Sequence, residues 1–182
     1  MGFGLIKVIN KKMEFLWSNI SSTALMLNLK GDVNGRHNYP LKPALNQITG
    51  SLFLLGLIIC IYNIKKLHNQ FFITYFIISL APAILTYPWE NPNMLRTFTV
   101  IPSLVYFIGM ALYFLTKIVI EHSNFKDKFF IKISVITVLS LIVFFSSFYE
   151  IRTYFVYQTS VFKQAFDIRE TLPKAIKSLS TQ

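Results

Sequence analysis

Four apolar runs without a charged residue constrain this chain more than any other feature of its sequence. They cover residues 49–64, 71–87, 98–116 and 133–149, and each contains 16 to 19 residues. A helix rises about 1.5 Å per residue, so about 17 to 20 residues cross a hydrocarbon core of roughly 30 Å. The runs are continuous rather than alternating, and a single chain in lipid must satisfy its backbone polar groups internally. The sequence therefore predicts an all-α integral membrane protein with four transmembrane helices.

Composition supports a lipid environment and argues against nucleic acid as a partner. Of the 182 residues 53% are hydrophobic and 14% are charged, whereas a soluble domain has about 25% charged residues. The net charge is +10, but the basic residues flank the apolar runs instead of lining one polar face. Anionic membrane lipid or a phosphate-bearing lipid is the partner that this charge favours. The single cysteine, Cys60, lies in an apolar run and predicts a small buried side chain without a disulfide.

The loops between the runs predict how the chain is oriented. Residues 65–70 and 117–132 hold six lysines, whereas residues 88–97 hold only Arg96 as a basic residue. Basic residues concentrate in short cytoplasmic loops, so the rule places residues 65–70 and 117–132 in the cytoplasm and both termini on the outer face. The two tails carry the other eleven basic residues, so this asymmetry is partly offset.

Residues 1–30 have a different pattern, with a helical apolar stripe and small polar residues opposite it. The stripe consists of Met13, Leu16, Trp17, Ile20, Ala24 and Leu27, and the polar side of Glu14, Ser18, Asn19, Ser21 and Ser22. The pattern predicts an amphipathic interfacial segment, either lying on the outer membrane surface or packed against other protein. A polar outer loop follows at residues 31–48, then the four-span domain at 49–149, and an outer tail at 150–182 that we interpret as a truncated soluble part.

The first outer loop concentrates polar side chains that can bind a ligand. Asp32, Arg36, His37 and Asn38 lie within seven residues, between glycine and proline residues that favour a tight turn. Such a loop can bind a metal through Asp32 and His37, hold a phosphate through Arg36, or cap itself with internal hydrogen bonds. Polar turns are common and one acid with one histidine is a weak metal signature, so the loop alone favours internal hydrogen bonds and predicts no metal site.

The second outer loop, residues 88–97, places Arg96 at the start of the third apolar run. A guanidinium forks onto two phosphate oxygens and stays protonated, so Arg96 is a candidate for phosphate recognition. Its alternative is an ordinary interfacial arginine whose charged end reaches the headgroups. Glu90 is the one carboxylate of this loop, and it can pair with Arg96 or act as an acid, a base or a metal ligand. A surface ion pair is the role that the pattern favours.

The two loops together resemble a known family. Residues 27–38 (LNLKGDVNGRHN), the entry into a span at residues 45–56, and residues 88–102 with NMLRT at 93–97 follow one another as in the C-terminal half of bacterial membrane glycosyltransferases of family 39. The similarity runs from about residue 13 to residue 167 and includes AFD at 165–167. The resemblance implies the type C glycosyltransferase fold in the bacterial inner membrane, and transfer of a sugar from a polyprenyl-phosphate donor on the outer face.

The resemblance also implies roles for particular residues. Arg96 would hold the donor phosphate, and Glu90 would be a secondary polar partner. The rim of the donor or acceptor site would be shaped by Asp32, Arg36, His37 and Asn38. The family has a histidine where this chain has Asn93, so an imidazole role there is in doubt. A divalent cation is compatible with both loops, but no set of residues identifies its ligands.

The family's catalytic carboxylate has no counterpart in this sequence, because Glu14 is the only acid before Asp32. In such a transfer a base deprotonates the acceptor while cations stabilise the leaving phosphate. This chain offers cations without a convincing base, so we expect it to be a C-terminal piece that is inactive without its N-terminal half. The alternative is a small non-enzymatic membrane subunit or remnant that stabilises partner membrane proteins.

Overall fold

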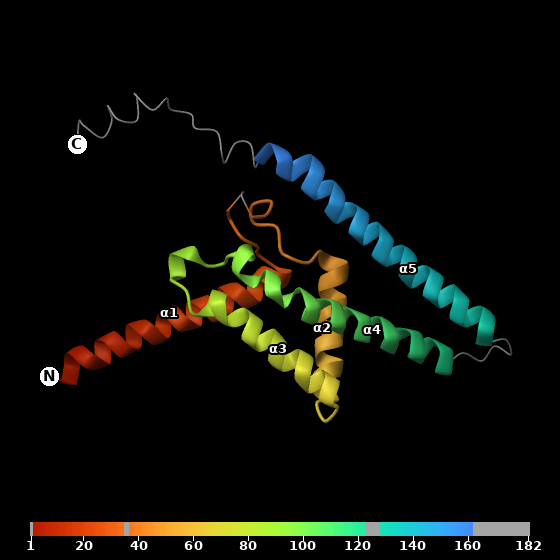
Figure 1. Ribbon diagram of the computed structural model, residues 1–182, viewed down its shortest axis with the longest axis horizontal. Coiled ribbons are helices and arrows are strands. Elements are labelled where there is room, and N and C mark those ends of the chain that lie inside the picture. Colours follow the sequence, from red (N-terminus) through yellow and green to blue (C-terminus); the bar gives the residue numbers. More distant parts are fainter. Residues whose placement is uncertain (1, 35–36, 123–127, 162–182) are drawn as a thin grey trace.

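The computed structural model describes residues 2–34, 37–122 and 128–161, and every regular element in these residues is helical. The described α-helices are α1 (Gly2–Asn28), α2 (Gln47–Tyr62), α3 (Leu67–Ile84), α4 (Ile101–His122) and α5 (Lys128–Arg152). Two 3₁₀ segments, η1 (Pro88–Glu90) and η2 (Met94–Val100), connect α3 to α4, and a π-helical segment, η3 (Thr153–Gln158), follows α5. In Figure 1, α2, α3 and α4 lie together at the centre, α1 extends to one side and α5 runs along another.

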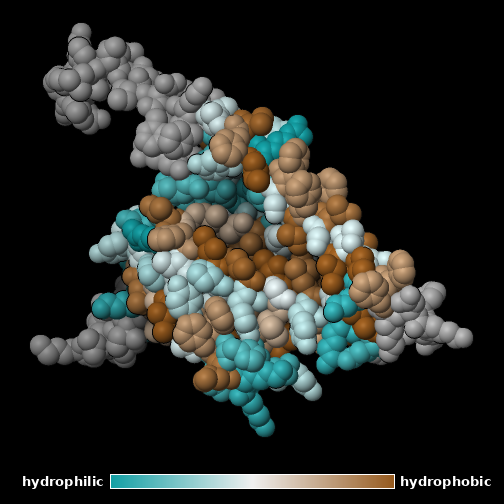
Figure 2. Space-filling model, turned by 45° about the vertical axis from the view of Figure 1, so that its right-hand side comes forward, coloured by the Kyte–Doolittle hydropathy of each residue, from teal (hydrophilic) through white to brown (hydrophobic). Residues whose placement is uncertain are grey.

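Three described stretches are long and apolar enough to cross a membrane: Leu67–Ile84, Met94–Glu121 and Phe129–Val161. The predicted apolar runs thus fall on α3, α4 and α5, and the chain is a membrane-embedded helical protein. The remaining run falls on α2, which is apolar but has only 16 residues, so the fourth span stays a prediction. On the face shown in Figure 2, hydrophobic residues gather across the middle and hydrophilic residues toward the upper and lower borders.

The helix ends differ from the ends of the apolar runs because charged and polar residues enter the helices. Helix α3 begins at Leu67, four residues before the predicted run, and its Asn69 is buried. The amide Nδ2 of Asn69 donates to the Asn63 carbonyl at 2.8 Å, and its Oδ1 accepts from the Tyr106 hydroxyl at 2.6 Å. Helix α4 continues past residue 116, where Lys117 and Glu121 pair one turn apart at 3.7 Å.

The core lies between α2 and α4, which pack against each other more extensively than any other described pair of elements. Its buried hydrophobic residues are Leu27, Phe53, Cys60, Val100, Leu104 and Phe107. The rings of Phe53 and Phe107 lie 6.0 Å apart. A Cβ atom on Gly56 would overlap the carbonyl of Phe107, so the absence of a side chain there lets the two backbones approach. Cys60 is buried and free, as the sequence predicts.

Helix α5 is tied to the rest of the chain by a small polar cluster near its C-terminal end. The Asn46 side-chain amide donates to Ser146 Oγ at 2.6 Å and to Glu150 Oε1 at 3.1 Å, and Lys42 forms an ion pair with Glu150. The helix does not end where the predicted run ends at residue 149, because the chain stays helical to residue 161. Residues 162–182 of the predicted outer tail, including AFD at 165–167, lie outside the described residues.

Helix α1 buries part of the side that the sequence pattern marks as polar and exposes part of its apolar stripe. Met13 and Trp17 of the predicted apolar stripe are 59% and 72% exposed, whereas Asn19, which the pattern placed on the polar face, is only 3% exposed. Thr23, Met26 and Leu27 are also buried. In lipid, apolar side chains face outward without penalty, and small polar side chains form hydrogen bonds between segments. The side of α1 that is buried against the rest of the chain therefore contains Asn19 and Thr23 as well as large hydrophobic residues.

Candidate functional site

The first outer loop is closed by a short ladder of backbone hydrogen bonds. Gly31 N donates to the Leu41 carbonyl at 3.1 Å, and Leu41 N donates to the Asp32 carbonyl at 2.9 Å. A Cβ atom on Gly31 would overlap the carbonyl of Lys42, so glycine is needed here for close approach of two backbone segments. Leu41 adopts a left-handed conformation with φ of 64°, which is uncommon outside glycine. The ladder holds Asp32 at the base of the loop.

The carboxylate of Asp32 joins the two outer loops. Its side chain is buried, and Oδ1 accepts from Asn34 N at 2.7 Å. Oδ2 lies 3.0 Å from His37 Nδ1 and accepts from Met94 N, in the second loop, at 3.1 Å. A buried carboxylate needs such partners, because leaving it unpaired costs several kcal/mol. The structure thus brings together two polar loops that are about 60 residues apart in the sequence.

The second loop is ordered by its own side chains. Asn93 caps η2, because its Oδ1 accepts from Leu95 N at 3.0 Å and from Arg96 N at 3.3 Å. Arg96 then forms an ion pair with Glu90, and both side chains keep more than a third of their surface exposed. The ion pair that the sequence favoured for Glu90 is therefore observed. Asn93, where the family has a histidine, builds the turn that positions Arg96.

Helix α1 is attached to the same loop through two asparagines. Asn19 Nδ2 donates to the carbonyls of Ile84 at 2.9 Å and Thr86 at 2.6 Å. In return, Asn91 Nδ2 donates to the Asn19 carbonyl at 2.9 Å and to Thr23 Oγ1 at 3.1 Å. Asn19 was not predicted as a site residue, because in the sequence it is one of several small polar residues on the same side of the helix, with Ser18, Ser21 and Ser22.

A groove of about 790 Å³ lies between α1 and the segment from Ile84 to Arg96. Its polar lining residues are Lys12, Asn19, Thr86, Glu90 and Arg96, and its apolar ones include Met13, Phe15, Leu16, Ile84 and Leu85. Tyr87 also lines the groove, and it forms an exposed stacked pair with Trp89, with centroids 4.6 Å apart. Exposed tyrosine and tryptophan are typical of the membrane interface. The lining of the groove therefore combines apolar and charged side chains.

The predicted site residues divide into two groups. Glu90 and Arg96 line the groove, whereas Asp32, His37 and Asn38 do not, and Asp32 reaches the second loop only through Met94 N. Asn38 Nδ2 donates to the Lys42 carbonyl at 2.5 Å, which stabilises the first loop. Arg36 lies outside the described residues. The internal hydrogen bonds that the sequence favoured for the first loop are present, and the residues described hold no cluster of three or more histidine, cysteine or acidic side chains.

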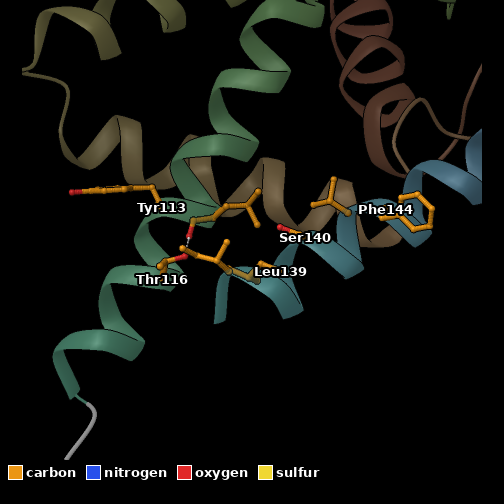
Figure 3. Close-up of a pocket in the computed structure, with 8 residues that line it drawn as sticks. Tyr113, Thr116, Leu139, Ser140 and Phe144 are labelled. Carbon is orange, nitrogen blue, oxygen red and sulfur yellow. Dashed lines mark hydrogen bonds between the residues drawn. The ribbon is translucent and has the colours of Figure 1, made fainter. Parts of the chain in front are cut away.

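A second hollow lies between α4 and α5 and has a different character (Figure 3). It measures about 480 Å³, and most of its lining residues are apolar, among them Leu112, Leu139, Val143 and Phe144. The Thr116 hydroxyl donates to the Leu112 carbonyl of its own helix at 2.8 Å. This hollow has no charged lining residue, and we place the candidate site at the groove beside Arg96 instead.

No protein-family model matches this chain, and no curated protein or solved structure matches it either. The fold and the groove define a membrane-embedded helical protein with an amphiphilic site next to two joined polar loops.

Proposed function

We propose that this chain is the C-terminal part of a membrane glycosyltransferase that uses a polyprenyl-phosphate sugar as donor on the outer face of the membrane. In this proposal Arg96 binds the donor phosphate, and Glu90 is a secondary polar partner that pairs with the guanidinium before the donor arrives. The observation that carries the proposal is that Arg96 and Glu90 line the same groove as several large apolar side chains. A lipid phosphate with a hydrocarbon tail likewise combines a charged group with an apolar one.

The chemistry of transfer assigns Arg96 a definite task. When the sugar leaves, the lipid phosphate gathers negative charge, and a guanidinium aimed at its oxygens stabilises that charge. Because Arg96 N is fixed by Asn93 and the whole turn by Asp32, the cation is held without further ordering of the backbone. The carboxylate of Asp32 is engaged on both oxygens, so we assign the base to the N-terminal half of the enzyme.

Lipid binding to the purified chain tests the proposal. The full chain in phosphatidylcholine vesicles should bind a polyprenyl phosphate saturably, and Arg96→Ala should weaken this binding about tenfold, equivalent to about 1.4 kcal/mol. Arg152→Ala is the matched control, because Arg152 lies on α5 outside the groove. Arg152→Ala should bind like the unmodified chain. Equal binding by Arg96→Ala, or binding that never saturates, would remove Arg96 from the proposed site.

The activity itself is tested in membranes that contain the complete enzyme. Transfer of a radiolabelled sugar from its polyprenyl phosphate should fall at least tenfold in Arg96→Ala. Unchanged transfer would overturn the catalytic role.

A non-enzymatic membrane subunit is the second candidate function, and a specific observation favours it. Asp32 is fully occupied by structural hydrogen bonds and Glu90 is paired with Arg96, so neither acid of the two loops is free to act as a base. A passive subunit predicts no saturable binding of the lipid phosphate, which the same titration measures.

A further inference from the structure

We propose that the groove lined by Arg96 recognises a hydroxyl group next to the lipid phosphate. In this proposal the ligand hydroxyl donates a hydrogen bond to Asn19 Oδ1. The inference rests on the proposed function for the identity of the ligand, an anionic lipid with a hydroxylated headgroup such as a glycosyl phosphate. It adds Asn19 as a specificity residue that neither loop motif contains.

The first step is the orientation of the Asn19 amide. Its Nδ2 donates to two backbone carbonyls, those of Ile84 and Thr86, at 2.9 and 2.6 Å. Exchanging the nitrogen and oxygen would set an oxygen against two carbonyl oxygens, so the amide orientation is fixed. Oδ1 is therefore the remaining acceptor of this side chain.

The second step is that Oδ1 is buried and has no hydrogen-bond partner among the residues that the structure describes. The side chain is only 3% exposed and belongs to the wall of the groove. An unpaired buried acceptor costs about 1–3 kcal/mol, so a donor that reaches it recovers a large share of this energy. Because the oxygen is buried, a hydroxyl reaches it only when a neighbouring group moves aside.

The third step is the charge of the groove. Lys12 and Arg96 contribute two cations against the single carboxylate of Glu90, and Lys12 has no ion-pair partner within residues 2–34, 37–122 and 128–161. The groove therefore favours an anionic group. A ligand with a phosphate at Arg96 and a hydroxylated substituent toward Asn19 would pair with the cations and would donate a hydrogen bond to the unpaired Asn19 Oδ1.

The fourth step is the choice of a lipid over a soluble phosphate. Met13, Phe15, Leu16 and Leu85 supply apolar walls that a free phosphate does not use. The exposed pair of Tyr87, which lines the groove, and Trp89 is typical of headgroup depth. A ligand with a hydrocarbon tail buries these walls and gains about 25 cal/mol for each Å² of apolar surface removed from water.

Two phosphodiesters that differ only in their hydroxyls test the inference. Dodecyl 2,3-dihydroxypropyl phosphate and dodecyl propyl phosphate carry the same charge and the same carbon skeleton. The full chain, reconstituted in phosphatidylcholine nanodiscs, should bind the dihydroxypropyl diester about tenfold more tightly, as one hydrogen bond to an orphan acceptor predicts. Glycerol phosphate without a tail should bind more weakly than either diester. Equal affinity for the two diesters would overturn the role of Asn19. If glycerol phosphate bound as tightly as the dihydroxypropyl diester, the inference that the ligand is a lipid would be wrong.

Asn19→Ala and Asn28→Ala form a matched pair of variants. Both residues are asparagines of α1 whose buried Oδ1 has no hydrogen-bond partner in the described part of the chain, but Asn28 donates to the Gly50 carbonyl and does not line the groove. The preference for the dihydroxypropyl diester should vanish in Asn19→Ala and persist in Asn28→Ala. A preference that survives in Asn19→Ala would overturn the assignment. If Asn19→Ala does not fold, the comparison of the two diesters in the unmodified chain still decides.

The outcomes separate this inference from the proposed function. One outcome is that polyprenyl phosphate binds saturably and through Arg96, but the chain shows no preference between the diesters. Phosphate binding at Arg96 would then stand, and hydroxyl recognition by Asn19 would be ruled out. A clear preference between the diesters, together with unchanged sugar transfer in Arg96→Ala, leaves the groove as a lipid site and removes Arg96 from the transfer reaction.

Discussion

At the scale of single residues, the site depends on side chains that support the backbone rather than on side chains that face a ligand. Asp32 receives hydrogen bonds from backbone groups of both loops, and Asn93 receives two from the start of η2. Each such bond contributes about 1 kcal/mol, and bonds to a charged acceptor somewhat more. Their combined effect is to fix the position at which Arg96 leaves the loop.

Glu90→Gln should increase the affinity of the chain for a lipid phosphate. The Glu90 carboxylate forms an ion pair with the Arg96 guanidinium and repels an incoming anion. An exposed ion pair is worth about 0–1 kcal/mol, so removing it should tighten binding of dodecyl phosphate about two- to fivefold at low salt. Titration at two salt concentrations measures the effect, which should shrink as salt rises.

Glu14→Gln is the control for this change. Glu14 lies on α1 next to residues of the groove but does not line it, and it carries the same charge. It should change the affinity less than Glu90→Gln does. Weaker binding in Glu90→Gln would show instead that Glu90 is needed to hold Arg96 in position.

The sequence predicted those residues of the two loops whose polar side chains differ from the apolar residues around them. Asp32, His37, Glu90 and Arg96 stand out as polar side chains in an apolar chain. The contact that joins the loops was not predictable, because its donor is the backbone N–H of Met94, which leaves no signature in the residue type. Asn19 lies on the side of α1 opposite the predicted apolar stripe, and hydrophobic periodicity carries no signal that this polar side is buried against the second loop.

At the scale of helices, the closest packing is between α2 and α4. Gly56 faces the Phe107 carbonyl, whereas Gly109 on α4 has no atom within 4 Å of an added Cβ. Gly56→Ala should therefore destabilise the fold by about 1–3 kcal/mol, as overpacking of a core does. Gly109→Ala should be neutral or stabilise by about 0.5–1 kcal/mol, because alanine favours the helix.

Thermal unfolding of the two variants in the same detergent measures this difference. The midpoint should fall in Gly56→Ala and stay level or rise in Gly109→Ala. Equal midpoints would contradict the close approach of α2 and α4.

Sequence predicted which segments are helical and missed where they end. Absence of charge marked the centres of α3, α4 and α5, because a charge at the centre of a bilayer is costly. It did not mark the ends, since Lys117 and Glu121 are accommodated at the C-terminal end of α4 and Asn69 is buried near the start of α3. The π-helical segment after Arg152 has no counterpart in an apolar pattern.

At the scale of the whole molecule, the helices sort the loops to two ends. Helices α2 and α3 follow one another through a short turn at residues 63–66, so the loop before α2 and the loop after α3 meet at the opposite end. The hydrogen bond from Met94 N to Asp32 requires both loops to be on one side of the membrane. The positive-inside rule predicts that this side is the outer face.

Cysteine labelling in sealed vesicles tests this arrangement. In a Cys60→Ala background, Tyr39→Cys and Trp89→Cys place thiols at exposed positions in the two outer loops, and Lys65→Cys places one in the turn between α2 and α3. A membrane-impermeant maleimide should react with the first two variants from the same side, and with Lys65→Cys only after the vesicles are opened or when they are inverted. Tyr39→Cys and Trp89→Cys reacting from opposite sides would be incompatible with the contact between Asp32 and Met94, and would separate Arg96 from the loop that positions it.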